Sequence, residues 1–183
     1  HRELLVLPTV ELIDTNIHDA EVLAELFAGC DTVINLVAIL NETRNDVFRA
    51  VHVVLPHRIA QTCRSMGIKR LLHMSALNAD AKLGASRYLQ SKGEGEDLVH
   101  ATAGDALHVT SFRPSVIFGP GDHFFNQFAG LLKRSPGVLP LPCPNARFAP
   151  VFVSDVVQAF CTALDNKASY GQRYELCGPH AYT

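Results

Sequence analysis

Tyr88 and Lys92 lie four residues apart in the segment Tyr88-Leu-Gln-Ser-Lys92, and Ser75 precedes them in His73-Met-Ser-Ala. A helix brings residues at this spacing onto one face, so we expect the Lys92 ammonium beside the Tyr88 phenol. A neighbouring cation lowers the pKa of a phenol, which would let Tyr88 exchange a proton with a substrate near neutral pH. Ser75 would hydrogen-bond the same substrate oxygen. These three residues are the candidate catalytic residues, although Tyr-x-x-x-Lys alone also occurs on ordinary exposed helices.

The segment before Ser75 predicts where this chemistry would take place. Leu71-Leu-His-Met is a short apolar run, typical of a buried parallel strand, and Ser75 follows it directly. Ligands of open α/β sheets bind beyond the carboxyl ends of the strands. We therefore expect Ser75 to lie at a ligand-binding edge of a sheet.

Two further predicted strands, 32–37 and 107–112, would end at the same edge. The first continues into a tail without bulky polar side chains, which suits contact with a flat cofactor. The second continues into Arg113-Pro-Ser-Val-Ile-Phe-Gly-Pro-Gly, where backbone groups can approach a ligand closely. We predict that the cofactor contacts are Leu36, Val37, Ala38, Met74, Tyr88, Lys92, Pro114, Ser115 and Ile117.

Strand and helix patterns alternate along the chain, which predicts an α/β fold with a doubly wound parallel sheet. The predicted strands are 10–13, 32–37, 70–74, 107–112, 148–151 and 174–176. The predicted helices are 20–28, 47–66, 87–101, 124–133 and 153–165, and a proline-rich loop covers 136–144. Gly29 is expected to end the first helix as a C-cap.

In this order and spacing, the strand-end serine, Tyr-x-x-x-Lys and Arg-Pro…Gly-Pro-Gly resemble the extended and atypical short-chain dehydrogenase/reductases, which are NAD-dependent epimerase/dehydratase-like. Finer detail in His73-Met-Ser-Ala-Leu-Asn, Ser86-Arg-Tyr-Leu-Gln-Ser-Lys and Ile117-Phe-Gly-Pro-Gly-Asp resembles the NAD(P)H-binding accessory subunit family of respiratory complex I (NADH:ubiquinone oxidoreductase) and its bacterial relatives. The shared features include Pro56, a proline inside a predicted helix.

The resemblance implies a Rossmann-like domain over residues 1–183, with 136–183 contributing a C-terminal lobe on the substrate side. A dinucleotide-binding unit opens with a strand and a glycine-rich turn, and no such turn precedes Leu36. We therefore expect the chain to lack the family's first βαβ unit, which would leave the strand at 10–13 without its partner. Either residues outside this sequence complete the molecule, or copies pair as a homo-oligomer.

Two functions follow from the resemblance and remain open. In the first, NAD(P)H is a structural cofactor of a protein that associates with complex I. In the second, the protein is an NAD(P)-dependent reductase, epimerase or dehydratase that acts on a nucleotide sugar or another hydroxy/keto substrate. Arg147 would then hold a substrate phosphate. His52 stands where many such enzymes place an asparagine, which weakens the case for turnover.

Composition excludes several other classes. The 183 residues carry a net charge of −2, which gives no basis for nucleic-acid binding. No run approaches the roughly 18 apolar residues of a membrane span, and no signal peptide is recognised. The five cysteines are odd in number and scattered, which favours reduced thiols and no metal site. We expect a cytoplasmic protein that could lie peripherally at the inner face of the respiratory membrane.

Overall fold

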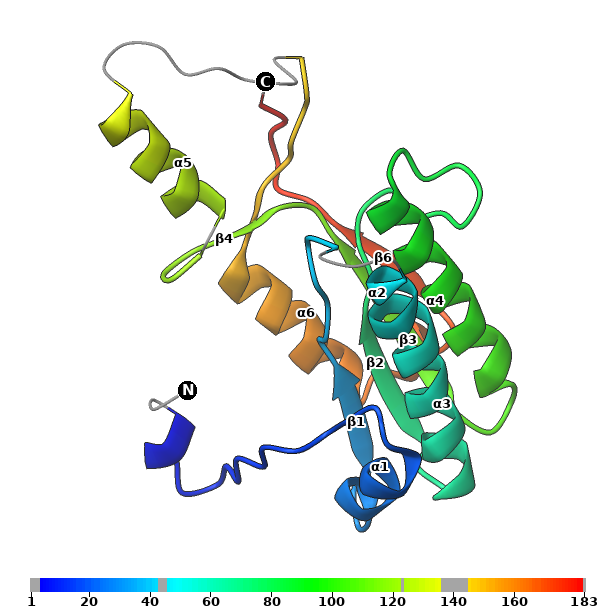
Figure 1. Ribbon diagram of the computed structural model, residues 1–183. Helices are drawn as coiled ribbons and strands as arrows, with labels where there is room; N and C mark the ends of the chain where they lie inside the picture. The colour runs from blue at the N-terminus through cyan, green and yellow to red at the C-terminus, as the bar shows by residue number, and fades with distance from the viewer. Residues whose placement is uncertain (1–3, 43–45, 123, 136–144, 183) are drawn as a thin grey trace.

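A four-stranded parallel sheet forms the centre of the computed structural model, which describes residues 4–42, 46–122, 124–135 and 145–182. The strands are β1 (Thr32–Asn35), β2 (Arg70–Met74), β3 (His108–Pro114) and β6 (Arg173–Leu176), in the order β1-β2-β3-β6. Helices α3 (Leu55–Ser65) and α4 (Arg87–Ala103) cover one face, and α6 (Val153–Leu164) covers the other (Figure 1). The predicted α/β fold with a doubly wound parallel sheet is therefore confirmed.

Smaller elements complete the described chain. The remaining helical segments are η1 (Leu4–Val6), α1 (Ala20–Phe27), α2 (Val47–Arg49), the π-helical turn η2 (Ala50–Val54), α5 (Phe124–Arg134) and η3 (Lys167–Ser169). Strands β4 (Ile117–Phe118) and β5 (Val151–Phe152) pair in parallel as a separate two-stranded sheet. Figure 1 shows α5 standing apart from the main sheet.

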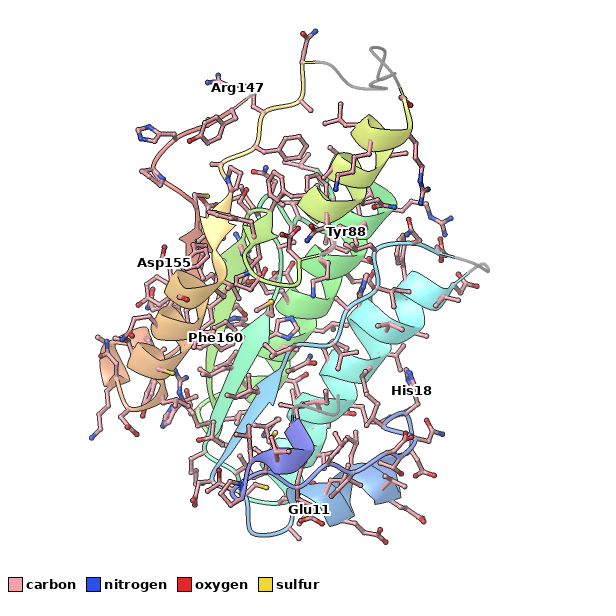
Figure 2. All side chains as sticks on the ribbon, turned by 90° about the vertical axis from the view of Figure 1, so that its left-hand side faces the viewer. Glu11, His18, Tyr88, Arg147, Asp155 and Phe160 are labelled. Atoms are coloured by element: carbon pink, nitrogen blue, oxygen red, sulfur yellow. The ribbon has the colours of Figure 1, made fainter. Side chains whose placement is uncertain are left out.

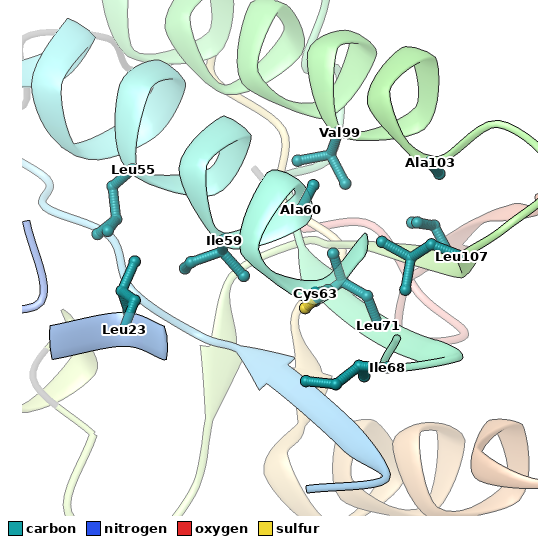
Figure 3. Close-up of a cluster of buried hydrophobic side chains, with 11 residues drawn as sticks. Leu23, Leu55, Ile59, Ala60, Cys63, Ile68, Leu71, Val99, Ala103 and Leu107 are labelled. Atoms are coloured by element: carbon teal, nitrogen blue, oxygen red, sulfur yellow. The ribbon is translucent and has the colours of Figure 1, made fainter. Parts of the chain in front are cut away.

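Two apolar clusters hold the layers together, one on each face of the sheet. Successive strand residues point to opposite faces, so Leu71 joins the first cluster and Leu72 the second. The first cluster lies between the sheet and α1, α3 and α4 (Figure 3). The second packs β3 against α6, with the Phe112 and Phe160 ring centroids 4.2 Å apart. β2 is therefore buried on both faces, as its continuous apolar run predicts.

The helix predicted at 47–66 forms, but with a change of geometry near its proline. α2 widens into the π-helical turn η2, and α3 begins just beyond it with Pro56 in its first turn. Proline has no backbone N–H, so an α-helical bond from Pro56 to the His52 carbonyl is excluded. A π-turn relieves such a defect without ending the helix. This turn holds His52 in the interior of the protein, where it is 1% exposed.

One predicted strand is wrong. Residues 10–13 form no strand, and Val10, Leu12 and Ile13 are exposed. The backbone N–H of Val10 instead bonds the Leu7 carbonyl in a turn. A strand needs a partner for its ladder of hydrogen bonds, and within the described residues no neighbouring strand lies beside this segment.

The C-terminal segment differs in detail from its prediction. The short strand expected at 148–151 begins only at Val151, while Phe148 forms an isolated antiparallel bridge with Tyr182. The proline-rich loop 136–144 lies outside the described residues. Within 145–182, β6 returns to the main sheet as its edge strand beside β3. None of the helices described is both long enough and apolar enough to cross a bilayer.

Candidate functional site

The candidate site lies where β1, β2 and β3 end. Asn35, His73 and Ser111 are direct neighbours across these strands, so the segments that follow them leave the sheet side by side. The contact continues past the strands, because the Ser75 N–H donates to the Phe112 carbonyl at 2.7 Å. The carboxyl edge of the sheet therefore carries the predicted cofactor segments, as the sequence predicts.

Helix α4 brings Lys92 to this edge. Ser86 caps the helix by accepting a hydrogen bond from the Leu89 N–H. Two turns later Lys92 is 1% exposed, and its ammonium donates to the Met74 carbonyl at the end of β2 (N···O 2.6 Å). Burial lowers the pKa of Lys92 to about 8, and the charge of Glu96 acts in the opposite direction. At neutral pH Lys92 is a cation held beneath the strand end.

Tyr88 lies one turn before Lys92 and is half-buried. Its ring meets the edges or faces of two other rings, those of His52 and Phe48, with centroids 5.3 and 6.0 Å away. Its hydroxyl has no hydrogen-bond partner within the described residues. Burial raises the pKa of Tyr88, because it disfavours the charged phenolate. This direction is opposite to the expectation that Lys92 would lower it.

Ser75 is turned toward the interior of the protein. Its hydroxyl donates to Glu96 Oε2 at 3.1 Å, and both residues are buried. The same carboxylate accepts two bonds from the Arg113 guanidinium, with Nε and Nη2 both 2.9 Å from Oε2. Arg173 lies further away, with Nε 3.8 Å from Oε1. Glu96 therefore ties the residues that follow β2 to the end of β3.

The other predicted contacts divide into two groups. Leu36, Val37 and Ala38 are exposed and follow β1 at the carboxyl edge. Met74 is half-buried at the end of β2 and Pro114 is buried at the end of β3, while Ser115 and Ile117 are half-buried just after β3, with Ile117 in β4. Arg147 is exposed, and Figure 2 shows it well away from Tyr88. The structure thus brings together all the predicted residues except Arg147.

Sequence reasoning missed the roles of two buried residues. Glu96 is 0% exposed and lies four residues after Lys92. This spacing places the two side chains on one face of a helix, so it indicates that Glu96 lies near Lys92. His52 accepts a hydrogen bond at Nε2 from the Ile39 N–H, 3.1 Å away. The resemblance marks the position of His52 but not its contact with Ile39, because the inward direction of the ring depends on the π-turn. Among the described residues no group of three or more histidine, cysteine, aspartate or glutamate side chains is arranged to hold a metal ion.

Comparison with known proteins identifies relatives of the chain. The model of the NAD dependent epimerase/dehydratase family matches residues 1–177. Similar curated proteins include subunit 9 of the NADH dehydrogenase (ubiquinone) 1 alpha subcomplex, mitochondrial, from Rattus norvegicus, which is 33% identical over 174 residues. That match covers 93% of this chain and 44% of the rat protein. The mitochondrial 40 kDa subunit of NADH-ubiquinone oxidoreductase from Neurospora crassa is 29% identical, with 95% and 44% covered. The chain therefore spans less than half the length of these relatives.

Solved structures share the fold at low identity. A dTDP-glucose 4,6-dehydratase from Streptomyces venezuelae with NAD bound matches with a TM-score of 0.85 at 21% identity, covering 100% of this chain and 62% of that one. A UDP-glucuronic acid 4-epimerase from Bacillus cereus in complex with NAD matches with a TM-score of 0.79 at 16% identity, covering 99% and 64%.

Proposed function

We propose, from the premise that the chain belongs to the NAD-dependent epimerase/dehydratase family, that it binds an NAD(P)H dinucleotide as a structural cofactor. The dinucleotide would lie across the carboxyl ends of β1, β2 and β3. The whole of 1–183 would act as one nucleotide-binding domain, with the segment after 136 on the substrate side.

The observation that carries this proposal is the direction of the Ser75 hydroxyl. A reductase of this kind needs a serine and a tyrosine hydroxyl that converge on one substrate oxygen. Here Ser75 donates to the buried Glu96 carboxylate, which is also held by Arg113. Turning Ser75 toward a substrate would break a buried hydrogen bond to a charged group, which costs about 1.5–3 kcal/mol. This arrangement favours holding a ligand over transforming one.

Other features of the edge suit a dinucleotide. Leu36 and Val37 are 56% and 38% exposed, so they offer apolar surface to a flat ring system. Lys92 is a buried cation at the strand end, and Tyr88 has a hydroxyl without a partner in the described structure. We propose that both hydrogen-bond the hydroxyls of the nicotinamide ribose. The two solved structures named above hold NAD, which is consistent with a nicotinamide dinucleotide here.

The curated relatives suggest a partner. Because the proteins from rat and Neurospora are subunits of mitochondrial NADH dehydrogenase, we propose that this protein associates peripherally with a respiratory NADH dehydrogenase. A dinucleotide held by the folded state alone would stabilise the protein in such an assembly by mass action.

Nucleotide retention tests the proposal. The protein expressed from its complete gene is purified gently and its mass is measured under native conditions, before and after addition of isotopically labelled NADPH and NADH. We expect a stoichiometric dinucleotide that exchanges over hours. Tyr88→Phe is expected to keep nearly the same nucleotide content. A protein that carries no dinucleotide and takes none up contradicts the proposal.

A second candidate is the enzymatic function, an NAD(P)-dependent reductase, epimerase or dehydratase on a hydroxy or keto substrate. The observation that favours it is that the Tyr88 hydroxyl has no partner in the described structure while Lys92 lies on the same helix face. Arg147 would then hold a substrate phosphate. Rapid nucleotide exchange, an oxidised and reduced mixture, and loss of turnover in Tyr88→Phe would support the enzyme over the structural cofactor.

A further inference from the structure

Two side chains accept hydrogen bonds from backbone N–H groups of the segment that follows β1. The Val37 N–H donates to Asn35 Oδ1 at 3.1 Å, and the Ile39 N–H donates to His52 Nε2 at the same distance. The first acceptor comes from the segment's own strand, whereas the second comes from η2, 13 residues after Ile39. These two bonds fix the backbone path of residues 36–38.

The hydrogen bonds determine the tautomer of His52. Because Nε2 accepts from a backbone N–H, the ring proton of the neutral imidazole must be on Nδ1. Nδ1 lies 2.9 Å from Ser91 Oγ and donates to it. The Ser91 hydroxyl then donates to the Tyr88 carbonyl, also 2.9 Å away. A continuous chain of bonds therefore runs from the Ile39 amide to the helix that carries Tyr88 and Lys92.

His73 has the opposite tautomer. Asn35 Oδ1 accepts the Val37 amide, so the Asn35 side-chain NH₂ faces His73 and donates to Nδ1 at 3.2 Å. The ring proton of His73 is then on Nε2, and this buried atom has no partner within the described residues. The two histidines at the site are thus expected to carry their ring protons on different nitrogens, which nitrogen chemical shifts report directly.

Packing holds the His52 ring in this position. Phe48 stacks on one side with centroids 5.2 Å apart, and Tyr88 meets the ring edge-on at 5.3 Å. Gly95 of α4 faces the backbone of the same turn, and a Cβ there would overlap the His52 carbonyl oxygen. The imidazole is therefore held between the cofactor segment and α4 from several directions.

We infer that His52 is a positioning residue, which sets the segment 36–39 relative to Tyr88 and Lys92 through the acceptor nitrogen Nε2. The inference rests on the proposed function only where it concerns the ligand, since the segment carries three of the predicted cofactor contacts. Misplacing that segment would weaken the binding of NADH and NADPH without removing any group that touches them.

The first test reads the geometry without a ligand. Nitrogen-15 histidine spectra of the protein expressed from its complete gene are expected to show His52 protonated on Nδ1 and His73 protonated on Nε2. In Ser91→Ala, His52 still accepts the Ile39 N–H at Nε2 but loses the acceptor of its Nδ1–H, so the Nδ1 signal is expected to shift while the proton stays on Nδ1. A wild-type His52 protonated on Nε2 would overturn the inference.

The second test measures Ile39 and the ligand together. His52→Ala is expected to expose the Ile39 amide to rapid hydrogen exchange and to weaken NADH and NADPH binding about tenfold, the effect of one hydrogen bond of ordinary strength. His52→Gln, which supplies another acceptor, is expected to recover part of both effects. His57→Gln, on the same helical run, is the matched control and is expected to change neither.

The outcomes separate the two proposals. If wild-type protein binds no dinucleotide, the proposed function fails, and Ile39 exchange still decides the role of His52. If His52→Ala binds both dinucleotides within twofold of wild type, or leaves Ile39 protected, the positioning role is overturned. Should His52→Ala fail to fold, Ser91→Ala and the tautomer of the wild-type protein still decide the question.

Discussion

At the scale of single residues, Glu96 is the carboxylate on which the polar side chains of the site converge. It is fully buried and accepts hydrogen bonds from Ser75 and Arg113. We expect Glu96→Gln to reduce the free energy of unfolding by about 3 kcal/mol, because it leaves the Arg113 charge half-buried without its partner. Urea unfolding monitored by circular dichroism measures the change.

Glu94 provides the control for this prediction. It lies on the same helix and pairs with Arg49 at 2.8 Å, but the two side chains are 43% and 61% exposed. An exposed pair contributes at most about 1 kcal/mol, so Glu94→Gln should change stability little. Equal losses in the two variants would show that the buried carboxylate has no special role.

His52 also makes the stability depend on pH. Burial, followed by the charge of Lys92, lowers the pKa of His52 from 6.5 to about 4. Between these values the unfolded chain binds a proton that the folded protein does not. The free energy of unfolding should therefore fall as the pH falls from 6.5 to 4, by about 1.4 kcal/mol per pH unit from this one group.

His52→Gln tests this dependence. Because glutamine does not titrate, we expect the variant to lose stability less steeply than wild type between pH 6.5 and 4.5, with His57→Gln as the control. Denaturant midpoints at several pH values give the slopes. Since burial also lowers the pKa of His73, the variant should keep a part of the acid dependence. Identical slopes in wild type and His52→Gln would contradict the assignment.

The sequence predicts the positions of the residues in the candidate site better than it predicts where their side chains point. Spacing alone places Tyr88 and Lys92 on one helix face, and the apolar run before Ser75 places that serine at a strand end. It does not show that Ser75 turns to Glu96, because that choice depends on a residue brought close only by the packing of α4 on the sheet. The prediction that the pKa of Tyr88 is lowered is wrong for a related reason, since burial rather than a nearby charge determines the direction of the shift.

At the scale of elements, close packing of α4 on η2 depends on a missing side chain. A Cβ at Gly95 would overlap the backbone oxygen of His52, which cannot move without shifting the helical turn. We expect Gly95→Ala to reduce the free energy of unfolding by about 3 kcal/mol, since overpacking against backbone outweighs the gain in helix propensity. Thermal unfolding followed by calorimetry would measure the loss.

Gly130 is the matched control, because it is also helical but has nothing within 4 Å of an added Cβ. Gly130→Ala is expected to raise stability by about 0.5–1 kcal/mol through helix propensity. If Gly95→Ala proved as harmless as Gly130→Ala, the close approach of the two helices would not exist in solution.

The predicted helices and strands are confirmed where the residue pattern of a segment agrees with the contacts that the fold gives it. β2 matches its predicted range fully, and α4 and β3 differ by two residues at most at either end. β4 and β5 were not predicted as a pair, because each has only two residues and gains its partner from a distant part of the chain. The segment 10–13 shows the reverse case, because it has a strand-like pattern but no neighbouring strand in the part of the chain that the structure describes.

At the scale of the whole molecule, the two ends of the sheet have different roles. The carboxyl end carries the candidate site, whereas the amino end is fastened by Arg70, whose side chain joins β2, β3, α6 and η3. Its guanidinium donates to the His108 and Ala163 carbonyls at 2.8 and 2.7 Å, and to the Ser169 hydroxyl at 2.9 Å. β2 separates the two ends by about 13 Å, given the usual rise per residue in a strand.

This separation predicts that stability and ligand binding can be changed independently. Arg70→Lys keeps the charge but loses the planar fork, so one ammonium cannot reach all of these acceptors. We expect it to reduce the free energy of unfolding by about 2–4 kcal/mol, because buried acceptors lose their donor. The affinity of the folded protein for NADH and NADPH should stay within twofold of wild type, in contrast to His52→Ala. Binding titrations well below the unfolding temperature, combined with urea unfolding of the same samples, measure both quantities. A parallel loss of affinity in Arg70→Lys would mean that the sheet transmits strain from one end to the other, and that the candidate site is not held by its own hydrogen bonds.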